Sequence, residues 1–247
     1  MIRVNLSLIK EAILDILYPQ DILCILCQKR HGDIDDKGLC PDCRESLPYV
    51  TQPVCQKCGR TITEETGFCL ECVYNQYHFR QAVSVFDYTP EIQHLIHRFK
   101  YRGVSYLSHV LGYWMAETYK QRCRWEIDLI VPVPLHPRRE RERGFNQSAL
   151  LAGEIGKNIG VKVVRGALIR RKYTPAQVGL NKLQRRQNLW DAFEVKESDK
   201  VKDRNILLVD DVFTTGSTVD ECSRVLMEAG AKQVYVLTLA TGRLTRG

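Results

Sequence analysis

The chain has none of the long apolar segments that membrane proteins need. No apolar run in its 247 residues approaches the roughly 20 residues that span a bilayer. A secretory signal is also missing, because Lys10, Glu11 and Asp15 interrupt the apolar residues near the N-terminus and no small-residue cleavage site follows. We therefore expect a cytoplasmic protein, and a position near the inner face of the membrane stays open.

Low-complexity tracts are absent as well, and the only internal repeat is a set of cysteine pairs. Hydrophobic residues make up 44% of the chain, enough for one sizeable core and a small appended unit. The formal net charge of +7 favours anionic partners such as phosphate esters or nucleic acid, without distinguishing between them.

Eight of the ten cysteines form four C-x-x-C pairs. Without an export signal, such pairs indicate metal ligation rather than disulfides. Eight thiolates suit two structural zinc ions with closed, four-thiolate shells, which are not catalytic. We favour sequential pairing over a cross-brace of alternate pairs, which gives two predicted sites: Cys24, Cys27, Cys40 and Cys43, and Cys55, Cys58, Cys69 and Cys72.

Apolar periodicity predicts the remaining elements. An amphipathic helix over residues 1–19 ends at Pro19. From about residue 80, strands and helices alternate, which predicts a mostly parallel α/β sheet covered on both faces. The expected strands are 82–86, 129–133, 161–164, 206–209 and 234–239, and the expected helices are 91–100, 107–120, 146–159 and 218–229.

The apolar run 206–209 leads into two carboxylates and then into a small polar loop. Asp210 and Asp211 can accept hydrogen bonds from ribose hydroxyls at the carboxyl edge of a sheet, where ligands bind in open α/β folds. A helix N-terminus follows, and its backbone N–H groups favour a phosphate. The loop residues are Thr214, Thr215, Gly216, Ser217 and Thr218. This segment therefore predicts a site for a 5-phosphorylated ribose.

The same string resembles the signature of type I phosphoribosyltransferases, which have a Rossmann-like core and a hood over the site. Further stretches, 131–147, 170–177 and 183–193, together with the cysteine-rich front, resemble the ComF/GntX family. The resemblance covers nearly the whole chain and implies three parts: the N-terminal helix 1–19, a double zinc ribbon over 20–78, and a phosphoribosyltransferase-like domain over 79–247.

This resemblance also assigns roles. It implies phosphoribosyl pyrophosphate as ligand, with Mg²⁺, Asp210 and Asp211 as the candidate catalytic residues, and a hood at about 170–190. It places a pyrophosphate loop over 134–143, with Pro134, His136, Arg138 and Arg139 as its residues. Purine-type members have an Asp where this chain has Thr214, so we do not expect a purine acceptor. The pocket is compatible with transferase activity and also with a binding or regulatory role.

Positive charge is concentrated in the middle of the chain. Residues 136–186 carry 13 Lys or Arg and 3 Asp or Glu, hence +10. This exceeds what a pyrophosphate needs and favours single-stranded DNA as a second ligand, with Phe145, Tyr173 and Trp190 available for stacking. The alternative is a solvated basic face whose Arg-Glu run is partly self-paired. The predicted DNA-binding residues are Arg138, Arg141, Arg143, Arg171, Lys172, Arg185 and Arg186.

Two functional hypotheses follow. The first, which the family resemblance favours, is a ComF-like protein of DNA uptake that binds both phosphoribosyl pyrophosphate and single-stranded DNA. The alternative is a phosphoribosyltransferase that acts on a small acceptor and has no role with DNA. A weaker third hypothesis is an adaptor whose zinc ribbons dock a DNA-uptake helicase or channel protein.

Overall fold

The computed structural model describes residues 23–63, 67–101, 106–173 and 189–242. These residues form two compact units that divide between Leu47 and Pro48. The predicted helix 1–19, most of the predicted hood, and Arg185 and Arg186 lie outside the described residues.

The first unit is a small cysteine-bearing fold. The Gln28 N–H donates to the Cys24 carbonyl at 2.9 Å, and the Cys24 N–H donates to the Lys29 carbonyl at 3.0 Å, which closes a tight turn around the first cysteine pair. Helix α2 (Pro41–Glu45) contains Cys43 and has Cys40 as its N-cap, and it starts at a proline, whose fixed φ suits the first helical position. Leu39 and the cysteines Cys24, Cys40 and Cys43 are buried in this unit, so the cysteine pairs form much of its interior.

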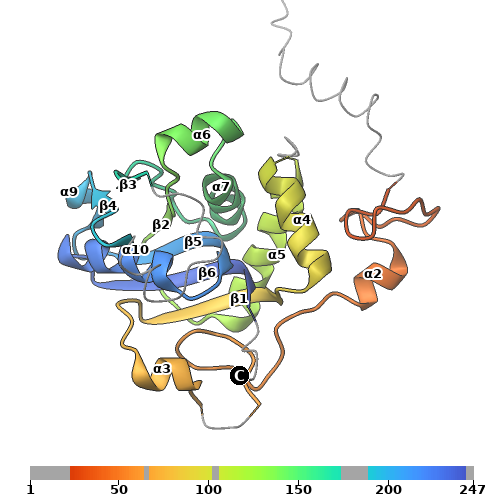
Figure 1. Cartoon of the computed structure of the whole chain (residues 1–247), viewed down its shortest axis with the longest axis horizontal. Helices are drawn as coiled ribbons and strands as arrows, with labels where there is room; N and C mark the ends of the chain where they lie inside the picture. The colour runs from red at the N-terminus through yellow and green to blue at the C-terminus, as the bar shows by residue number, and fades with distance from the viewer. Residues whose placement is uncertain (1–22, 64–66, 102–105, 174–188, 243–247) are drawn as a thin grey trace, which may run out of the picture. The chain divides into compact units, whose positions relative to one another are not determined.

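The second unit is built on a four-stranded parallel sheet in the order β1-β6-β5-β2 (Figure 1). Its strands are β1 (Gln81–Asp87), β2 (Leu129–Pro132), β5 (Asn205–Phe213) and β6 (Gln233–Thr241). All three pairings are parallel, and Ile206 lies between Leu129 and Val234 in register. The prediction of a mostly parallel α/β sheet is therefore confirmed.

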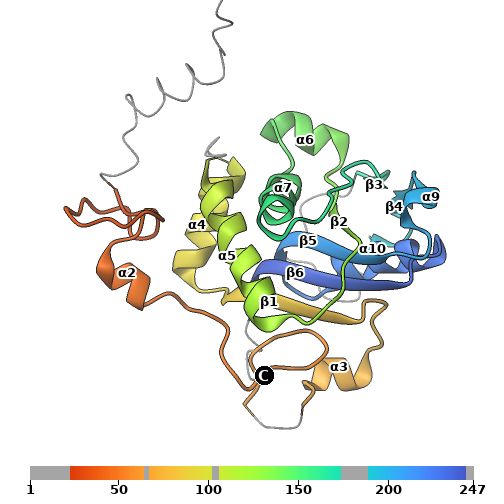
Figure 2. The same ribbon diagram turned by 180° about the vertical axis from the view of Figure 1, so that it is seen from behind.

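Helices cover both faces of this sheet. Helices α5 (Leu107–Arg122) and α7 (Gln147–Ile159) lie side by side on one face, as Figure 2 shows. Helix α10 (Ser217–Glu228) contacts β5 and β6 on the other face. There its Cys222 and Leu226 join one buried cluster with Ile206 and Leu208. Alternate strand residues thus point into two cores, because side chains alternate along a strand.

The remaining elements lie around the sheet. They are α3 (Leu70–Tyr74), α4 (Pro90–Tyr101), α6 (Pro137–Arg143) and α9 (Ser198–Val201), with a two-stranded antiparallel sheet of β3 (Leu168–Arg170) and β4 (Phe193–Val195). Within the described ranges, no helix combines the length and apolarity needed to cross a bilayer.

Two predictions about strands need correction. The expected strand 161–164 is reduced to a single parallel bridge between Val163 and Ile130 at the edge of β2, because within the described residues only Ile130 of β2 bonds to it: its N–H donates to the Lys162 carbonyl and its carbonyl accepts from the Val164 N–H. Strand β5 continues past Val209 to Phe213, since its pairing with β6 runs as far as Thr241. The acidic pair therefore lies within the part of β5 that pairs with β6, rather than after the strand.

The second cysteine set packs against β1. The Ala82 N–H of β1 donates to the Lys57 carbonyl at 2.8 Å. Gly59 has φ +72°, and a Cβ at this position would lie 2.4 Å from the Ala82 carbonyl oxygen, so only glycine allows the approach. Because this set belongs to the unit that contains the sheet, the double ribbon predicted over 20–78 is divided between the two compact units.

Candidate functional site

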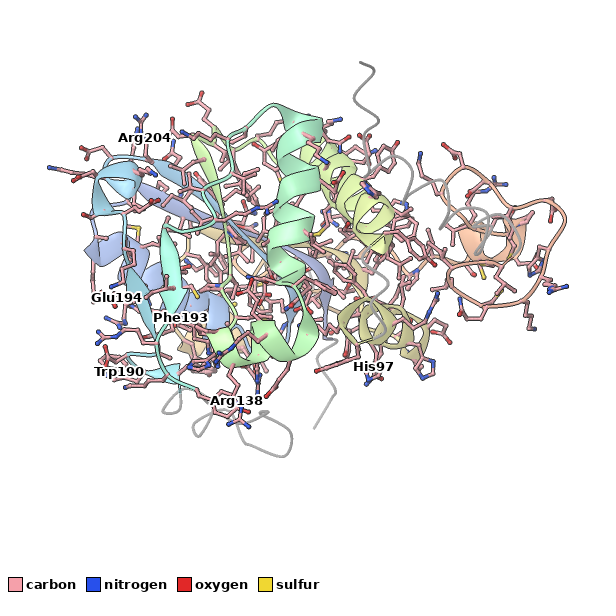
Figure 3. All side chains as sticks on the ribbon, turned by 90° about the horizontal axis from the view of Figure 1, so that it is seen from above. His97, Arg138, Trp190, Phe193, Glu194 and Arg204 are labelled. Carbon is pink, nitrogen blue, oxygen red and sulfur yellow. The ribbon has the colours of Figure 1, made fainter. Side chains whose placement is uncertain are left out.

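The carboxyl ends of β2 and β5 bring the two predicted loops to one edge of the sheet. The Val133 N–H donates to the Val209 carbonyl at 2.9 Å, so the chain leaves β2 beside Asp210. In Figure 3, Arg138 and Trp190 lie at this edge, and Arg204, just before β5, lies at the opposite one. The edge is the usual ligand position in open α/β sheets.

The acidic pair is buried, and each carboxylate has its own partner. Asp210 is 7% exposed and accepts a hydrogen bond from the Ser148 hydroxyl at 2.8 Å. Asp211 is 5% exposed and forms an ion pair with the ammonium of Lys100, in the last turn of α4. Burial lowers the pKa of Lys100, but the attraction of Asp211 outweighs this and raises the pKa above its ordinary value.

Ser148 and Lys100 were not predicted as site residues. Asn146 caps α7 by accepting from the Ser148 N–H at 3.0 Å, and its side-chain amide donates to the Val133 carbonyl at 3.1 Å. This cap fixes the Ser148 hydroxyl next to Asp210. Asn146 directly before an apolar helix is a helix-capping signal that the sequence shows. The pairing of Lys100 with Asp211 has no such signal, because 111 positions separate the two residues.

The Asp210 carboxyl has a raised pKa. Burial, together with the negative charge of Asp211, raises the pKa of Asp210 to about 7, while the Ser148 hydrogen bond acts in the opposite direction. The folded state holds this proton more tightly than the unfolded state does. Asp210 therefore contributes its full stabilisation at a pH below the ordinary pKa of a carboxyl group, and this stabilisation is lost as the pH rises through about 7. Hydroxyl donors of a bound ribose favour the ionised form, so ligand binding should release a proton from Asp210.

We therefore predict that Asp210→Asn, which keeps an acceptor for Ser148 but does not titrate, flattens the pH dependence of stability. The melting temperature of the wild type should fall more between pH 5 and pH 8 than that of the variant. Asp203→Asn is the matched control, since this exposed residue has φ +58°, which asparagine tolerates. Equal pH slopes for wild type and Asp210→Asn would contradict the assignment of this proton to Asp210.

The predicted phosphate loop forms a tight turn at the start of α10. Gly216 is the N-cap, with φ +78° and ψ −6°, a left-handed conformation that glycine adopts without strain. The hydroxyls of Thr215 and Ser217 lie 2.8 Å apart. The first N–H groups of a helix have no intrahelical acceptor and face outward along its axis, so this turn offers backbone donors, hydroxyls and a favourable dipole to an anion.

The predicted pyrophosphate loop is organised by its own short helix. His136 caps α6, and its Nδ1 accepts from the Arg138 N–H at 3.2 Å. The ring of Tyr173 gathers the loop's cations: Arg138 lies 4.9 Å and Arg139 5.8 Å from its centroid, and the His136 ring is 5.2 Å away. The structure therefore brings Arg138, Arg139 and His136 together at one aromatic side chain.

Behind this loop lies a cavity of about 470 Å³, bounded by α6, α7 and β3. Arg165, Arg170 and Glu140 contribute charges to its wall. Burial, and then the charge of Arg139, lowers the pKa of Arg170, while Asp210 among others raises it. After Lys100, Arg170 is the second cationic residue near the acidic pair that was not predicted from the sequence. It follows two apolar residues, Leu168 and Ile169, and nothing in that local pattern marks it as a site residue.

Several of the predicted DNA-binding residues have carboxylate partners. Arg138 pairs with Glu142 at 3.0 Å, Arg171 with Glu194 at 3.3 Å, and Lys172 with Asp191 at 3.2 Å. Arg141 is exposed on α6, and Arg143 lies 4.9 Å from the Tyr101 ring. These pairs lower the field of the segment below its formal charge.

The aromatic residues of this segment also differ from one another. Phe145 packs against buried Phe99, with ring centroids 5.9 Å apart. Trp190 is 60% exposed, and the Arg224 guanidinium lies 4.6 Å from its ring centroid. Arg224 is itself fixed by Glu221 at 2.7 Å. Of the three predicted stacking residues, Trp190 therefore has a more exposed side chain than Tyr173, which is 42% exposed.

The cysteines gather in the two sequential sets, and the sequential pairing is confirmed. Within each set, all four Sγ atoms lie within 4.8 Å of one another. The Cys58 and Cys69 sulfurs are 3.7 Å apart, and the Cys27 and Cys40 sulfurs 4.0 Å. A tetrahedral zinc with Zn–S bonds of about 2.3 Å requires sulfurs roughly 3.8 Å apart, so both sets fit zinc, which would hold the turns together.

Two family models match the chain. A double zinc ribbon domain matches residues 13–73, and a phosphoribosyl transferase domain matches residues 146–246. The first covers both cysteine sets, and the second covers the acidic pair, the phosphate loop and the cap of α7.

Relatives match nearly the whole chain. Competence protein F of Haemophilus influenzae is 31% identical over 222 residues, which cover 88% of this chain and 96% of that protein. DNA utilization protein YhgH of Escherichia coli K12 is 32% identical over 221 residues, covering 88% and 96%. Competence protein ComFC of Bacillus subtilis is 27% identical over 235 residues, covering 88% and 94%. With its cysteine sets, its parallel sheet and these relatives, the chain belongs to the ComF family of competence and DNA utilization proteins.

Proposed function

We propose that this protein serves DNA uptake or use by binding phosphoribosyl pyrophosphate, with Mg²⁺, at the carboxyl edge of its sheet and single-stranded DNA on the basic surface beside it. The observation that carries the proposal is the buried pair Asp210 and Asp211, placed directly before the helix-start loop 214–218. The carboxylates suit the ribose hydroxyls, and the loop suits the 5-phosphate. The names of the relatives support the role with DNA.

The pyrophosphate would lie between this loop and the segment from Pro134 to Arg143. Arg139 and Arg170 supply positive charge there, and Mg²⁺, which prefers hard oxygen donors, would enter with the ligand and neutralise part of its charge. The family assignment leaves transferase chemistry as one use of the site, and ligand binding without turnover as another.

Calorimetric titration with phosphoribosyl pyrophosphate, with and without Mg²⁺, tests the first part. We expect saturable binding that weakens without the metal, and weaker binding of ribose 5-phosphate. Titration of labelled single-stranded DNA, with and without phosphoribosyl pyrophosphate, tests the second part and measures any coupling between the two ligands. If the protein binds neither phosphoribosyl pyrophosphate nor ribose 5-phosphate, the proposed ribose-phosphate site is wrong.

We predict that Trp190→Ala weakens binding of single-stranded DNA by about 5- to 150-fold, because stacking of one base contributes about 1–3 kcal/mol. Tyr74→Ala is the control, since Tyr74 is an exposed aromatic residue (82%) far along the chain from the basic segment. The affinity of the wild type should also fall as salt rises. Affinity that is independent of salt would argue against phosphate contacts.

The alternative, a transferase for a small acceptor with no role in DNA binding, draws support from the ion pairs of Arg138, Arg171 and Lys172. Cations that are already paired attract a polyanion less strongly. This alternative is favoured if phosphoribosyl pyrophosphate binds and single-stranded DNA does not bind at low salt.

A further inference from the structure

Side chains of the second cysteine region contact the backbone carbonyls of the predicted phosphate loop, residues 214–218. The guanidinium of Arg60 donates from Nη2 to the Thr214 carbonyl, and the Tyr77 hydroxyl donates to the Thr215 carbonyl at 3.3 Å. More than 130 positions separate each pair, so these contacts are tertiary.

These two contacts orient the donors of the loop. In a planar trans peptide, the C=O and the following N–H point in opposite directions. Fixing the carbonyls of Thr214 and Thr215 toward Arg60 and Tyr77 therefore turns the N–H groups of Thr215 and Gly216 away from them. Those are the backbone donors that an anion at the start of α10 would meet.

Arg60 is itself held rigidly. It is 4% exposed, its Nη1 donates to the Glu71 carboxylate at 2.9 Å, and its guanidinium lies 5.2 Å from the centroid of the Phe213 ring. Arg60 follows Cys58 by two positions, and Glu71 lies between Cys69 and Cys72. Both ends of this ion pair are thus carried by the turns that would bind the second zinc.

The loop also has little room to move independently of this support. A Cβ at Gly216 would lie 2.7 Å from the Phe213 ring and 3.2 Å from the Tyr77 ring. The His78 N–H donates to the Asp220 carboxylate in the first turn of α10 at 2.7 Å. The loop and the chain segment that follows the cysteines therefore pack as one body.

We propose that Arg60 is a positioning residue for the 5-phosphate, and that the second cysteine set is thereby part of the phosphate site rather than a separate docking module. The proposal rests on the proposed binding of phosphoribosyl compounds. Arg60 touches no ligand; it acts by fixing the Thr214 carbonyl through a charge-assisted hydrogen bond inside the protein.

The test compares Arg60→Met with the wild type in calorimetric titrations of ribose 5-phosphate, phosphoribosyl pyrophosphate and Mg²⁺-pyrophosphate. We expect the affinity for the two ribose phosphates to fall about tenfold or more, and the affinity for Mg²⁺-pyrophosphate, which has no 5-phosphate, to stay unchanged. Arg60→Lys should restore part of the loss, because lysine can donate to one acceptor but lacks the fork that also reaches Glu71. Zinc content should stay at two per chain.

Arg80→Met is the matched control, since Arg80 is an exposed arginine whose backbone N–H, rather than its side chain, donates to Val234. Tyr77→Phe removes only the hydroxyl and should weaken ribose 5-phosphate binding in the same direction by a few fold, even if Arg60→Met folds poorly. Unchanged ribose 5-phosphate affinity in both variants overturns the inference. An equal loss for Mg²⁺-pyrophosphate also overturns it, because the effect would then be general. If the wild type binds pyrophosphate but no ribose phosphate, the proposed function itself fails.

Discussion

Replacing Asp210 and Asp211 together by asparagine should weaken phosphoribosyl pyrophosphate binding by about 100-fold. Each change exchanges a charge-assisted hydrogen bond to a ribose hydroxyl for a neutral one, which is worth roughly half as much. A loss of about 1.4 kcal/mol at each position is tenfold in affinity. The asparagines keep the volume of the buried side chains, an acceptor for Ser148 and an oxygen for the ammonium of Lys100.

Three measurements distinguish a lost ribose contact from damage to the fold. Calorimetry gives the affinity for phosphoribosyl pyrophosphate, and the affinity for Mg²⁺-pyrophosphate should change little because that ligand has no ribose. Circular dichroism should show a folded α/β protein. The exposed residue Asp203 provides the control Asp203→Asn. Binding by the double variant as tight as that of the wild type would remove these carboxylates from the site.

The second large effect concerns zinc, and the two sites should respond differently. Cys58→Ser with Cys69→Ser should lower the melting temperature of the sheet by more than 10 °C or prevent folding. Cys55, Cys58 and Cys69 are buried in the cluster that contains Phe79 and Val219. A structural zinc supplies about 10–16 kcal/mol, which is comparable with the whole stability of a domain, about 5–15 kcal/mol.

The matched variant at the first site is Cys27→Ser with Cys40→Ser. These residues belong to the compact unit that ends at Leu47, so we expect one zinc per chain and a melting temperature of the sheet within a few degrees of the wild type. Elemental analysis gives the zinc content, and calorimetric melting gives the transitions. Chelator titration of the wild type covers the case in which the second-site variant does not fold. A sheet that melts equally early in both variants would contradict this asymmetry.

Much of the local structure could be predicted from the sequence. The apolar run before Asp210 and the small polar loop after it predicted both the strand and the start of α10, because those residues satisfy backbone requirements within a few positions. The spacing of the cysteines predicted the four pairs for a similar reason, since a C-x-x-C turn brings its own two sulfurs together, and it favoured sequential tetrads over a cross-brace.

Short elements with long connections escaped prediction. Strands β3 and β4 have three residues each and pair through Ile169 and Glu194, so neither carries enough alternation to be recognised. Val161 to Val164 had the composition of a strand but formed only one bridge at Ile130. Whether an apolar run becomes a strand depends on a partner edge, which composition does not specify.

The sequence alone determined the local patterns of this protein: eight cysteines in four C-x-x-C pairs, two adjacent carboxylates after an apolar run, a small polar loop at a helix start and a basic middle segment. Tertiary structure decided which residues contact them. It placed Lys100 against Asp211, Ser148 against Asp210 and Arg60 behind Thr214. It also joined the second cysteine set to the sheet, as the close approach of Gly59 to β1 requires. This difference between what the sequence and what the tertiary structure determined has one physical cause. Local motifs satisfy backbone geometry over a few residues, whereas a buried charge takes its partner from whichever helix or turn packs beside it.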